Sequence, residues 1–255
     1  LMKNVGLILF ILVGILLGQT NLEKGLAAFT RRAEGSRENI AKPEAINEAI
    51  EYYNLSLSDS DPEIDAVIGL LKSYYFKGKF VAQSENHKKI VFDKAKTLAL
   101  PYIEKYPNRA DIRYWYLTNL GSWAEVYGIL TAAKEGVADQ MREHALKIIF
   151  LDYNYEDGGG YLLLGAVHYK SPYIPFLLSW PNNKEALKFL EKAVNTGEAT
   201  AVQRVYLAQA LYKGEKKVRA LTLLNEVANM VPDKNDTLSD WEQIKKARSL
   251  LKDYK

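Results

Sequence analysis

Apolar residues recur along the chain at helical spacing, in a pattern that is repeated four times. Each copy begins with an alanine, continues as an amphipathic stretch and ends about three helical turns later at a proline or glycine. The copies span 49–62, 95–107, 186–197 and 220–232. In the third copy, apolar residues between Ala186 and Val194 fall at i, i+1, i+4, i+7 and i+8, which is one face of a helix. Recurrence of such a unit predicts a helical-repeat protein.

Further amphipathic stretches supply partner helices for these copies, at 63–76, 112–127 and 204–212. Gly78 and Gly214 are expected to form turns, and the polar stretch 79–89 is either an extended loop or a prolonged helix. The whole predicts about ten to twelve helices in one continuous domain over 19–255.

Polar residues at capping-box spacing mark two expected helix starts. Asn182 and Glu185 stand before the third copy, and Ser239 and Glu242 stand before the last helix. In that last helix Ile244 belongs to an apolar stripe. The lysines and arginine of the opposite face are expected to meet water and cap the stack; they are Lys245, Lys246, Arg248 and Lys252.

Ala186, Leu190 and Ala193 resemble the second half of a tetratricopeptide repeat, which carries alanines around a large apolar residue. The last copy retains Ala220, Leu224 and Pro232 of the same pattern. The resemblance implies an all-α fold, a superhelix of tetratricopeptide-like helical hairpins.

A short apolar run over 5–17 follows Lys3 and precedes Gly18. Its length fits the hydrophobic region of a signal peptide and is too short for a membrane span. We therefore expect residues 1–18 to be a signal peptide, with an uncleaved N-terminal anchor as the alternative, and the protein to be exported.

The composition excludes several classes of function. Cysteine is absent, which excludes disulfides, thiolate metal sites, cysteine nucleophiles and a lipid anchor. The net charge is +3, and the basic residues are interspersed with acidic ones along the predicted helices, so nucleic-acid binding is not expected.

The middle of the chain is unusually aromatic, because residues 102–180 hold 15 of the 29 aromatic side chains. Trp115, Asn119 and Trp123 are spaced i, i+4 and i+8, so an amide lies between two indoles on one helix face. One interpretation is that these side chains fill the core between two repeats. The other is an aromatic groove with one polar group that orients a ligand.

Three glycines, at 158–160, precede the apolar helix that contains Tyr161 and Leu164. They indicate either a tight turn or a helix N-terminus with free amides for an anion. The candidate ligand groove accordingly consists of Trp115, Asn119, Trp123, Gly159, Gly160, Tyr161 and Leu164.

Tyr114, Trp115, Tyr116, Asn119, Gly121 and Trp123, followed by Gly159, Gly160, Leu164, Gly165, Pro172 and the helix 186–194, resemble the T-component family of tripartite ATP-independent periplasmic (TRAP) transporters. The similarity covers about residues 45–250. It implies a periplasmic helical-repeat protein that associates with the transporter's substrate-binding protein and forms a ring-like trimer with an apolar passage. Gln19 stands where that family has its lipid-bearing cysteine, and positions 161–163 are apolar where a basic residue is expected.

Catalytic motifs are not evident. His87, His144 and His168 have no second ligand at metal-site spacing and are interpreted as surface or hydrogen-bonded histidines. The run 152–157 has Asp157 where a calcium loop needs glycine. No nucleophile elbow, Walker loop or dinucleotide fingerprint is present. We expect no enzymatic activity, no metal and no cofactor.

Two functional hypotheses follow. The first is an exported binding protein of a TRAP-type transport system, with a substrate-binding protein as its partner, an apolar or organic ligand in its groove, or both. The second is a non-catalytic scaffold subunit of a bacterial envelope assembly. A homo-oligomer is compatible with either hypothesis.

Overall fold

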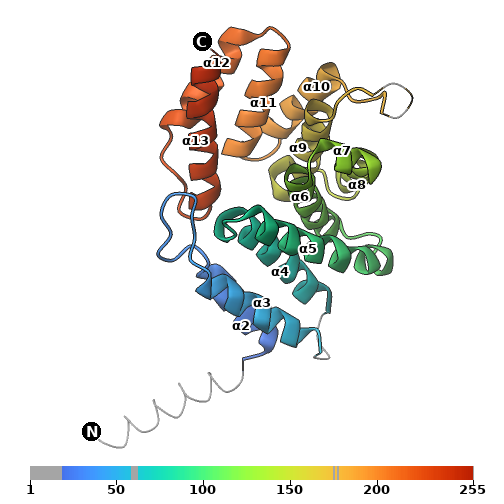
Figure 1. The fold of residues 1–255 in the computed structure, drawn as a ribbon, viewed down its shortest axis with the longest axis vertical. Helices are drawn as coiled ribbons and strands as arrows, with labels where there is room; N and C mark the ends of the chain where they lie inside the picture. Colours follow the sequence, from blue (N-terminus) through green and yellow to red (C-terminus); the bar gives the residue numbers. More distant parts are fainter. Residues whose placement is uncertain (1–18, 59–62, 175, 177, 255) are drawn as a thin grey trace, which may run out of the picture.

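A computed structural model describes residues 19–58, 63–174, 176 and 178–254. Within these ranges the chain forms twelve α-helices, one π-helix and no β-strand (Figure 1). The expected signal peptide, residues 1–18, lies outside the described residues. The helices are α2 (Asn21–Thr30), α3 (Glu44–Ser56), α4 (Glu63–Phe76), the π-helix η1 (Lys77–Val81), α5 (Glu85–Lys105), α6 (Ala110–Tyr127), α7 (Ile129–Lys134), α8 (Val137–Leu151), α9 (Tyr155–Lys170), α10 (Asn183–Val194), α11 (Ala201–Lys213), α12 (Lys217–Asn229) and α13 (Thr237–Asp253).

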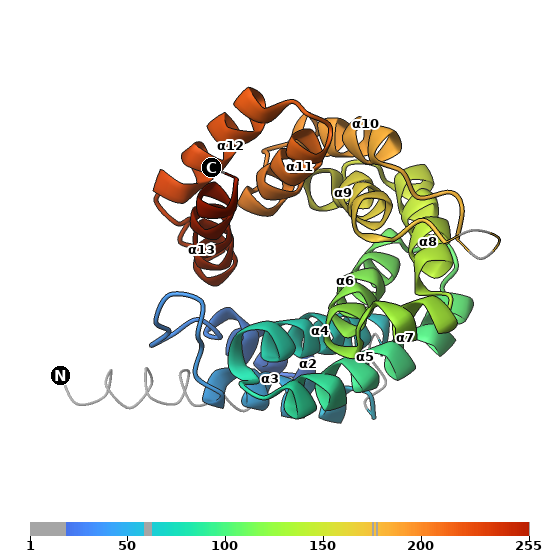
Figure 2. The same ribbon diagram turned by 45° about the horizontal axis from the view of Figure 1, so that its top comes forward.

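Consecutive helices pack as antiparallel pairs in two curved layers. Helices α4, α6, α9, α11 and α13 face the centre of the molecule, and α5, α8, α10 and α12 lie outside them (Figure 2). Neighbouring inner helices also touch each other: α4 contacts α6, and α11 contacts α13. This is an all-α helical-repeat fold, as predicted, and no helix within the described ranges is long and apolar enough to cross a membrane.

The alanines that open the four sequence repeats lie at the centre of the packing. Ala49, Ala95, Ala186 and Ala220 are fully buried, in α3, α5, α10 and α12. Each helix begins several residues before its alanine, so the alanine marks a buried position inside the helix and not the helix start. A methyl side chain there leaves room for a neighbouring helix.

Two expected helix boundaries differ from the structure. Gly78 does not form a turn, because it lies inside η1, where an added Cβ would stand 2.4 Å from the ring of Phe92. Its small size therefore serves close packing. Helix α13 starts at Thr237, so Ser239 and Glu242 lie within it and form no capping box, whereas Asn182 does cap α10 by accepting the Glu185 amide at 2.9 Å.

Helix α13 brings the end of the superhelix back to its beginning. Leu238 of α13 is buried in the core cluster formed by α2, α3 and α4. Lys245 pairs with Glu38 and donates to Asn39 Oδ1 at 2.7 Å, and Lys79 of η1 pairs with Glu242 at 2.7 Å. These contacts close the stack into a ring around a central space (Figure 2).

We expect Leu238→Ala to lower the free energy of unfolding by about 2–5 kcal/mol, the usual cost of a cavity at a buried leucine. Val231→Ala is the matched control, because Val231 is 87% exposed, and it should change stability by less than about 0.5 kcal/mol. Urea unfolding measures both. Equal stability of the two variants would show that α13 does not dock on the first repeat in solution.

Candidate functional site

Asn119 and Trp123 lie in the core of the repeat stack. Asn119 is fully buried and donates through Nδ2 to the carbonyl oxygens of Leu71 at 3.0 Å and Trp115 at 2.7 Å, which ties α6 to α4. Trp123 is 4% exposed; its indole N–H donates to Asp93 of α5 at 2.7 Å, and its ring stacks on Tyr127. The burial of both side chains supports their interpretation as core residues.

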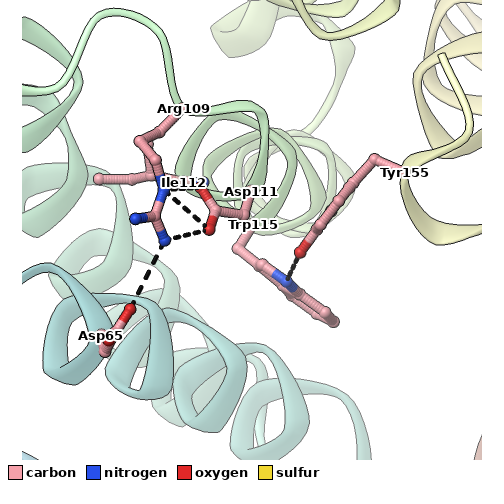
Figure 3. Close-up of polar contacts among 6 residues, drawn as sticks. All are labelled: Asp65, Arg109, Asp111, Ile112, Trp115 and Tyr155. Carbon is pink, nitrogen blue, oxygen red and sulfur yellow. Dashed lines mark hydrogen bonds and ion pairs between the residues drawn. The ribbon is translucent and has the colours of Figure 1, made fainter. Parts of the chain in front are cut away.

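Trp115 is half-buried on the same helix. Its indole N–H donates to the hydroxyl of Tyr155 on α9 at 3.2 Å (Figure 3). One turn earlier, Asp111 accepts from Arg109 at 2.6 Å and from the Ile112 amide at 2.8 Å, and Arg109 also reaches Asp65 of α4 at 3.5 Å (Figure 3). Trp115 therefore joins α6 to α9, and Arg109 joins the start of α6 to α4.

Of the glycines at 158–160, Gly158 lies in a tight turn, and Gly159 and Gly160 belong to the helix that follows it. Three consecutive residues, Glu156, Asp157 and Gly158, have left-handed backbone angles, a conformation that costs about 1–2 kcal/mol for a residue with a side chain. Buried Gln203 holds the turn by donating to the Asp157 carbonyl at 2.7 Å.

The other predicted residues near this turn are packing residues too. An added Cβ on Gly159 would lie 2.4 Å from the ring of Tyr114, and one on Gly160 would lie 2.9 Å from Ile149. Leu164 is 1% exposed, and Tyr161 packs at the edge of the α10–α11 core. The predicted residues thus lie on α6 and α9, but none of them lines the central cavity of the molecule.

A cavity of about 460 Å³ lies in the centre of the ring. Its walls come from α4, η1, α6, α7, α8, α9, α11 and α13 and from the segment that follows α9. Most of the lining is apolar and includes Leu117, Val137, Met141, Leu163, Val167 and Leu178. Helix α6 contributes the face that carries Thr118, Gly121, Ser122 and Glu125, beside the face of the two indoles. The volume is that of a small-molecule site.

Charged side chains from four elements meet in the same cavity. They are Lys79 of η1, Glu125 of α6, Lys170 of α9, and Glu242 and Lys246 of α13, and the neutral Tyr206 of α11 lies beside them. Lys170 pairs with Glu125, and Lys79 pairs with Glu242 at 2.7 Å. Lys246 forms no ion pair within the described part of the chain, and its ammonium lies 5.1 Å from the centre of the Tyr206 ring.

The pKa values of this group show how the charges interact. Burial lowers the pKa of Lys246, and the neighbouring charge of Lys170 lowers it further. Burial alone would also lower the pKa of Lys79, but attraction to Glu242 and Glu125 outweighs it and raises that pKa. In the same way Lys170 and Lys79 overcome the effect of burial on Glu125 and lower its pKa. Lys246 is therefore the cation that its surroundings stabilise least.

These charged residues were not predicted as a site. Of the four basic residues expected on a solvated face of the last helix, Lys245, Arg248 and Lys252 are exposed, but Lys246 lines the cavity. The one sequence feature that could have indicated a charged site is Lys170, which ends the otherwise apolar helix α9. Lys170 is far in sequence from the other charges, and Glu242 and Lys246 form an ordinary i, i+4 pair on a helix rich in charges, so the spacing carries no motif.

The histidines differ in environment. His144 is partly buried and accepts through Nδ1 from the Arg113 guanidinium at 2.7 Å. His168 is 7% exposed and accepts the Asn182 amide at 3.4 Å, and His87 is exposed. This agrees with the expectation of surface or hydrogen-bonded histidines. No group of three or more metal-ligating side chains gathers anywhere in the described ranges.

No model of a known protein family matches the chain, and no curated protein matches it either. The fold defines the class, an all-α helical-repeat protein with a central cavity. Membership of the tetratricopeptide or TRAP-associated families stays a prediction.

We expect Gly159→Ala to destabilise the protein by about 1–3 kcal/mol, because its Cβ would overlap the half-buried ring of Tyr114. Gly121→Ala is the matched control on an inner helix: its Cβ would meet only Met141, at 3.5 Å. That change should raise stability by about 0.5–1 kcal/mol through helix propensity. Thermal or urea unfolding measures whether the two substitutions change stability in opposite directions. A stabilised Gly159→Ala variant would contradict the contact between Gly159 and Tyr114.

The Arg113–His144 contact predicts a pH dependence of stability. Burial and the Arg113 charge lower the pKa of His144 in the folded state, whereas the unfolded value is about 6.5. Below about pH 6.5 the unfolded chain binds a proton on His144 that the folded chain does not. The free energy of unfolding therefore decreases as the pH is lowered through that range. His144→Asn should reduce this fall between pH 7.5 and 5.5 in urea unfolding. Identical pH profiles for the two proteins would refute the assignment.

Proposed function

We propose that this chain is a non-catalytic binding protein that holds a small, mainly apolar organic molecule in its central cavity. The observation that carries the proposal is the cavity itself, a partly open space of about 460 Å³ lined by helices from both ends of the chain. Ligand sites combine a largely apolar wall with a few convergent polar groups, and this cavity has both. A core without a ligand would be filled by side chains at normal packing density.

The cellular role extends this proposal. The apolar run over 5–17 supports export, and the resemblance to the TRAP T-component family supports a place in a periplasmic transport system. In that role the ring delivers its ligand to a substrate-binding protein or receives it from one. A central cavity is compatible with the apolar passage that the resemblance implies.

A scaffold function is the second candidate, and one observation favours it. Leu146 and Phe150 lie one turn apart on the outer helix α8 and are 45% and 80% exposed. Apolar side chains on an outer face are typical of protein contacts. A scaffold of this kind needs no ligand in the cavity, so filling the cavity separates the two functions.

Gly121→Leu tests the binding function, because Gly121 lies in the cavity wall and has space beyond its Cα. The probe is N-phenyl-1-naphthylamine, an uncharged dye that fluoresces in apolar surroundings. We expect the wild-type chain to bind the dye and Gly121→Leu to weaken binding by about tenfold or more, the equivalent of about 1.4 kcal/mol. Fluorescence titration gives both dissociation constants.

The control is Glu226→Leu, which adds the same side chain at an exposed position of the outer helix α12. It should bind the dye as the wild type does. Binding that is equal in all three proteins would place the dye elsewhere and count against the cavity as the ligand site. Circular dichroism before the titration checks that the Gly121→Leu variant is folded.

A further inference from the structure

The cavity has more positive than negative side chains, and its surplus cation is well defined. Three lysines and two glutamates line it. Glu125 pairs with Lys170, and Glu242 pairs with Lys79 at 2.7 Å, so each glutamate already has a lysine partner. Lys246 is the remaining lysine, and no ion pair joins it to any described carboxylate.

The surroundings of Lys246 do not neutralise it in another way. The ring of Tyr206, 5.1 Å from the ammonium, offers a cation–π contact worth about 0.5–2 kcal/mol. Burial and the positive charges of Lys170 and Lys79 lower the pKa of Lys246, and the opposing attraction of Glu125 and Glu242 offsets them only in part. A negative group near Lys246 would remove this electrostatic cost, and a positive group would increase it.

A second polar group without a partner lies one turn away on α13. Gln243 is 5% exposed, lines the cavity, and donates from Nε2 to Glu242 at 3.3 Å. Its Oε1 is buried and forms no hydrogen bond within the described structure. A buried carbonyl oxygen of this kind costs about 1–3 kcal/mol when it has no donor. Lys246 therefore offers a cation to an anionic group, whereas Gln243 offers an acceptor that a hydroxyl or N–H of the ligand, and not a carboxylate, would satisfy.

We propose that the ligand is an amphipathic organic anion, with its acidic head group bound by Lys246 and its apolar body against α6, α8 and α9. The inference rests on the proposed function and assigns the chemistry of the ligand. The apolar part of the wall includes Leu117, Met141, Leu163 and Val167, and the charged part lies on η1, α9 and α13. This separation of apolar and charged walls matches a molecule with one charged end.

The family resemblance leads us to expect a basic residue within positions 161–163, but these positions are apolar. In the folded chain the cation comes from α13, about eighty residues later, and reaches the cavity only through ring closure. A neutral ligand would leave Lys246 uncompensated, which is the physical reason for preferring an anion.

The experiment compares two probes of equal chain length, octanoate and octan-1-ol, as competitors of bound N-phenyl-1-naphthylamine. Both fill the apolar part, but only octanoate carries a charge. We expect octanoate to bind the wild-type chain at least about tenfold more tightly than octan-1-ol, as a charge-assisted hydrogen bond predicts. Lys246→Met should remove this preference and leave the octan-1-ol affinity within about twofold.

Two further variants make the result specific. Lys246→Arg keeps the charge and should keep most of the preference for octanoate, which also shows that position 246 tolerates substitution. Lys252→Met removes a lysine from an exposed position of the same helix and should bind both probes as the wild type does.

The outcomes separate the two proposals. Displacement of the dye by both probes with equal affinity, unchanged in Lys246→Met, would overturn the anionic ligand and leave the binding function in place. A preference for octanoate that persists in Lys246→Met would also overturn the assignment to Lys246. Failure of the dye and of both probes to bind at millimolar concentration would overturn the binding function together with the anion inference.

Discussion

Close contact between glycines and large side chains is the constraint on which the stack depends. The ring of Tyr53 lies between Gly25 and Gly69, where added Cβ atoms would come within 2.7 and 2.5 Å of it. Gly78 faces Phe92, and Gly165 would bring a Cβ within 2.6 Å of Leu190. Such pairs recur from the first helix pair to α9 and α10. They let the helix backbones approach closely while the rings and leucines fill the space between them.

Ring closure is what gives this repeat protein a cavity. An open stack would expose the inner faces of its helices to water along one broad groove. Here Leu238 inserts into the first core cluster and Lys79 pairs with Glu242 across the join, so α13 forms a wall opposite α6. The Lys79–Glu242 side chains are 21% and 27% exposed. This pair is better shielded than the pair of Lys170 and Glu125, which are 39% and 45% exposed and contribute little to stability.

The arrangement also separates two roles within helix α6. One face carries Asn119 and Trp123, whose polar atoms bond to α4 and α5 and hold the layers together. The adjacent face, with Thr118 and Gly121, meets the cavity and carries small side chains. The aromatic richness of this region is therefore mainly a property of the core. The cavity borders this core, and its surplus positive charge comes from Lys246, near the C-terminal end of the chain.

The sequence by itself determined the helical-repeat fold, because helical periodicity, buried alanines and helix-stopping prolines act within a few turns of one chain segment. The same local signals identified α4 with its correct bounds, and of the two alternatives that they left open for the glycines at 158–160, the structure shows the tight turn, at Gly158. Residues that are close in sequence on one helix face, such as Asn119 and Trp123, were correctly grouped, but periodicity does not distinguish a groove from a core.

Only the tertiary structure decided which face of α13 meets water. Lys246 lies among alternating charged residues, and nothing in its local spacing separates it from the exposed Lys245 or Lys252. Its position depends on the curvature accumulated over all the preceding helix pairs, which brings α13 back against the first repeat. The cavity and its surplus positive charge are made by contacts between segments more than a hundred residues apart, and such contacts leave no periodic signal in the sequence.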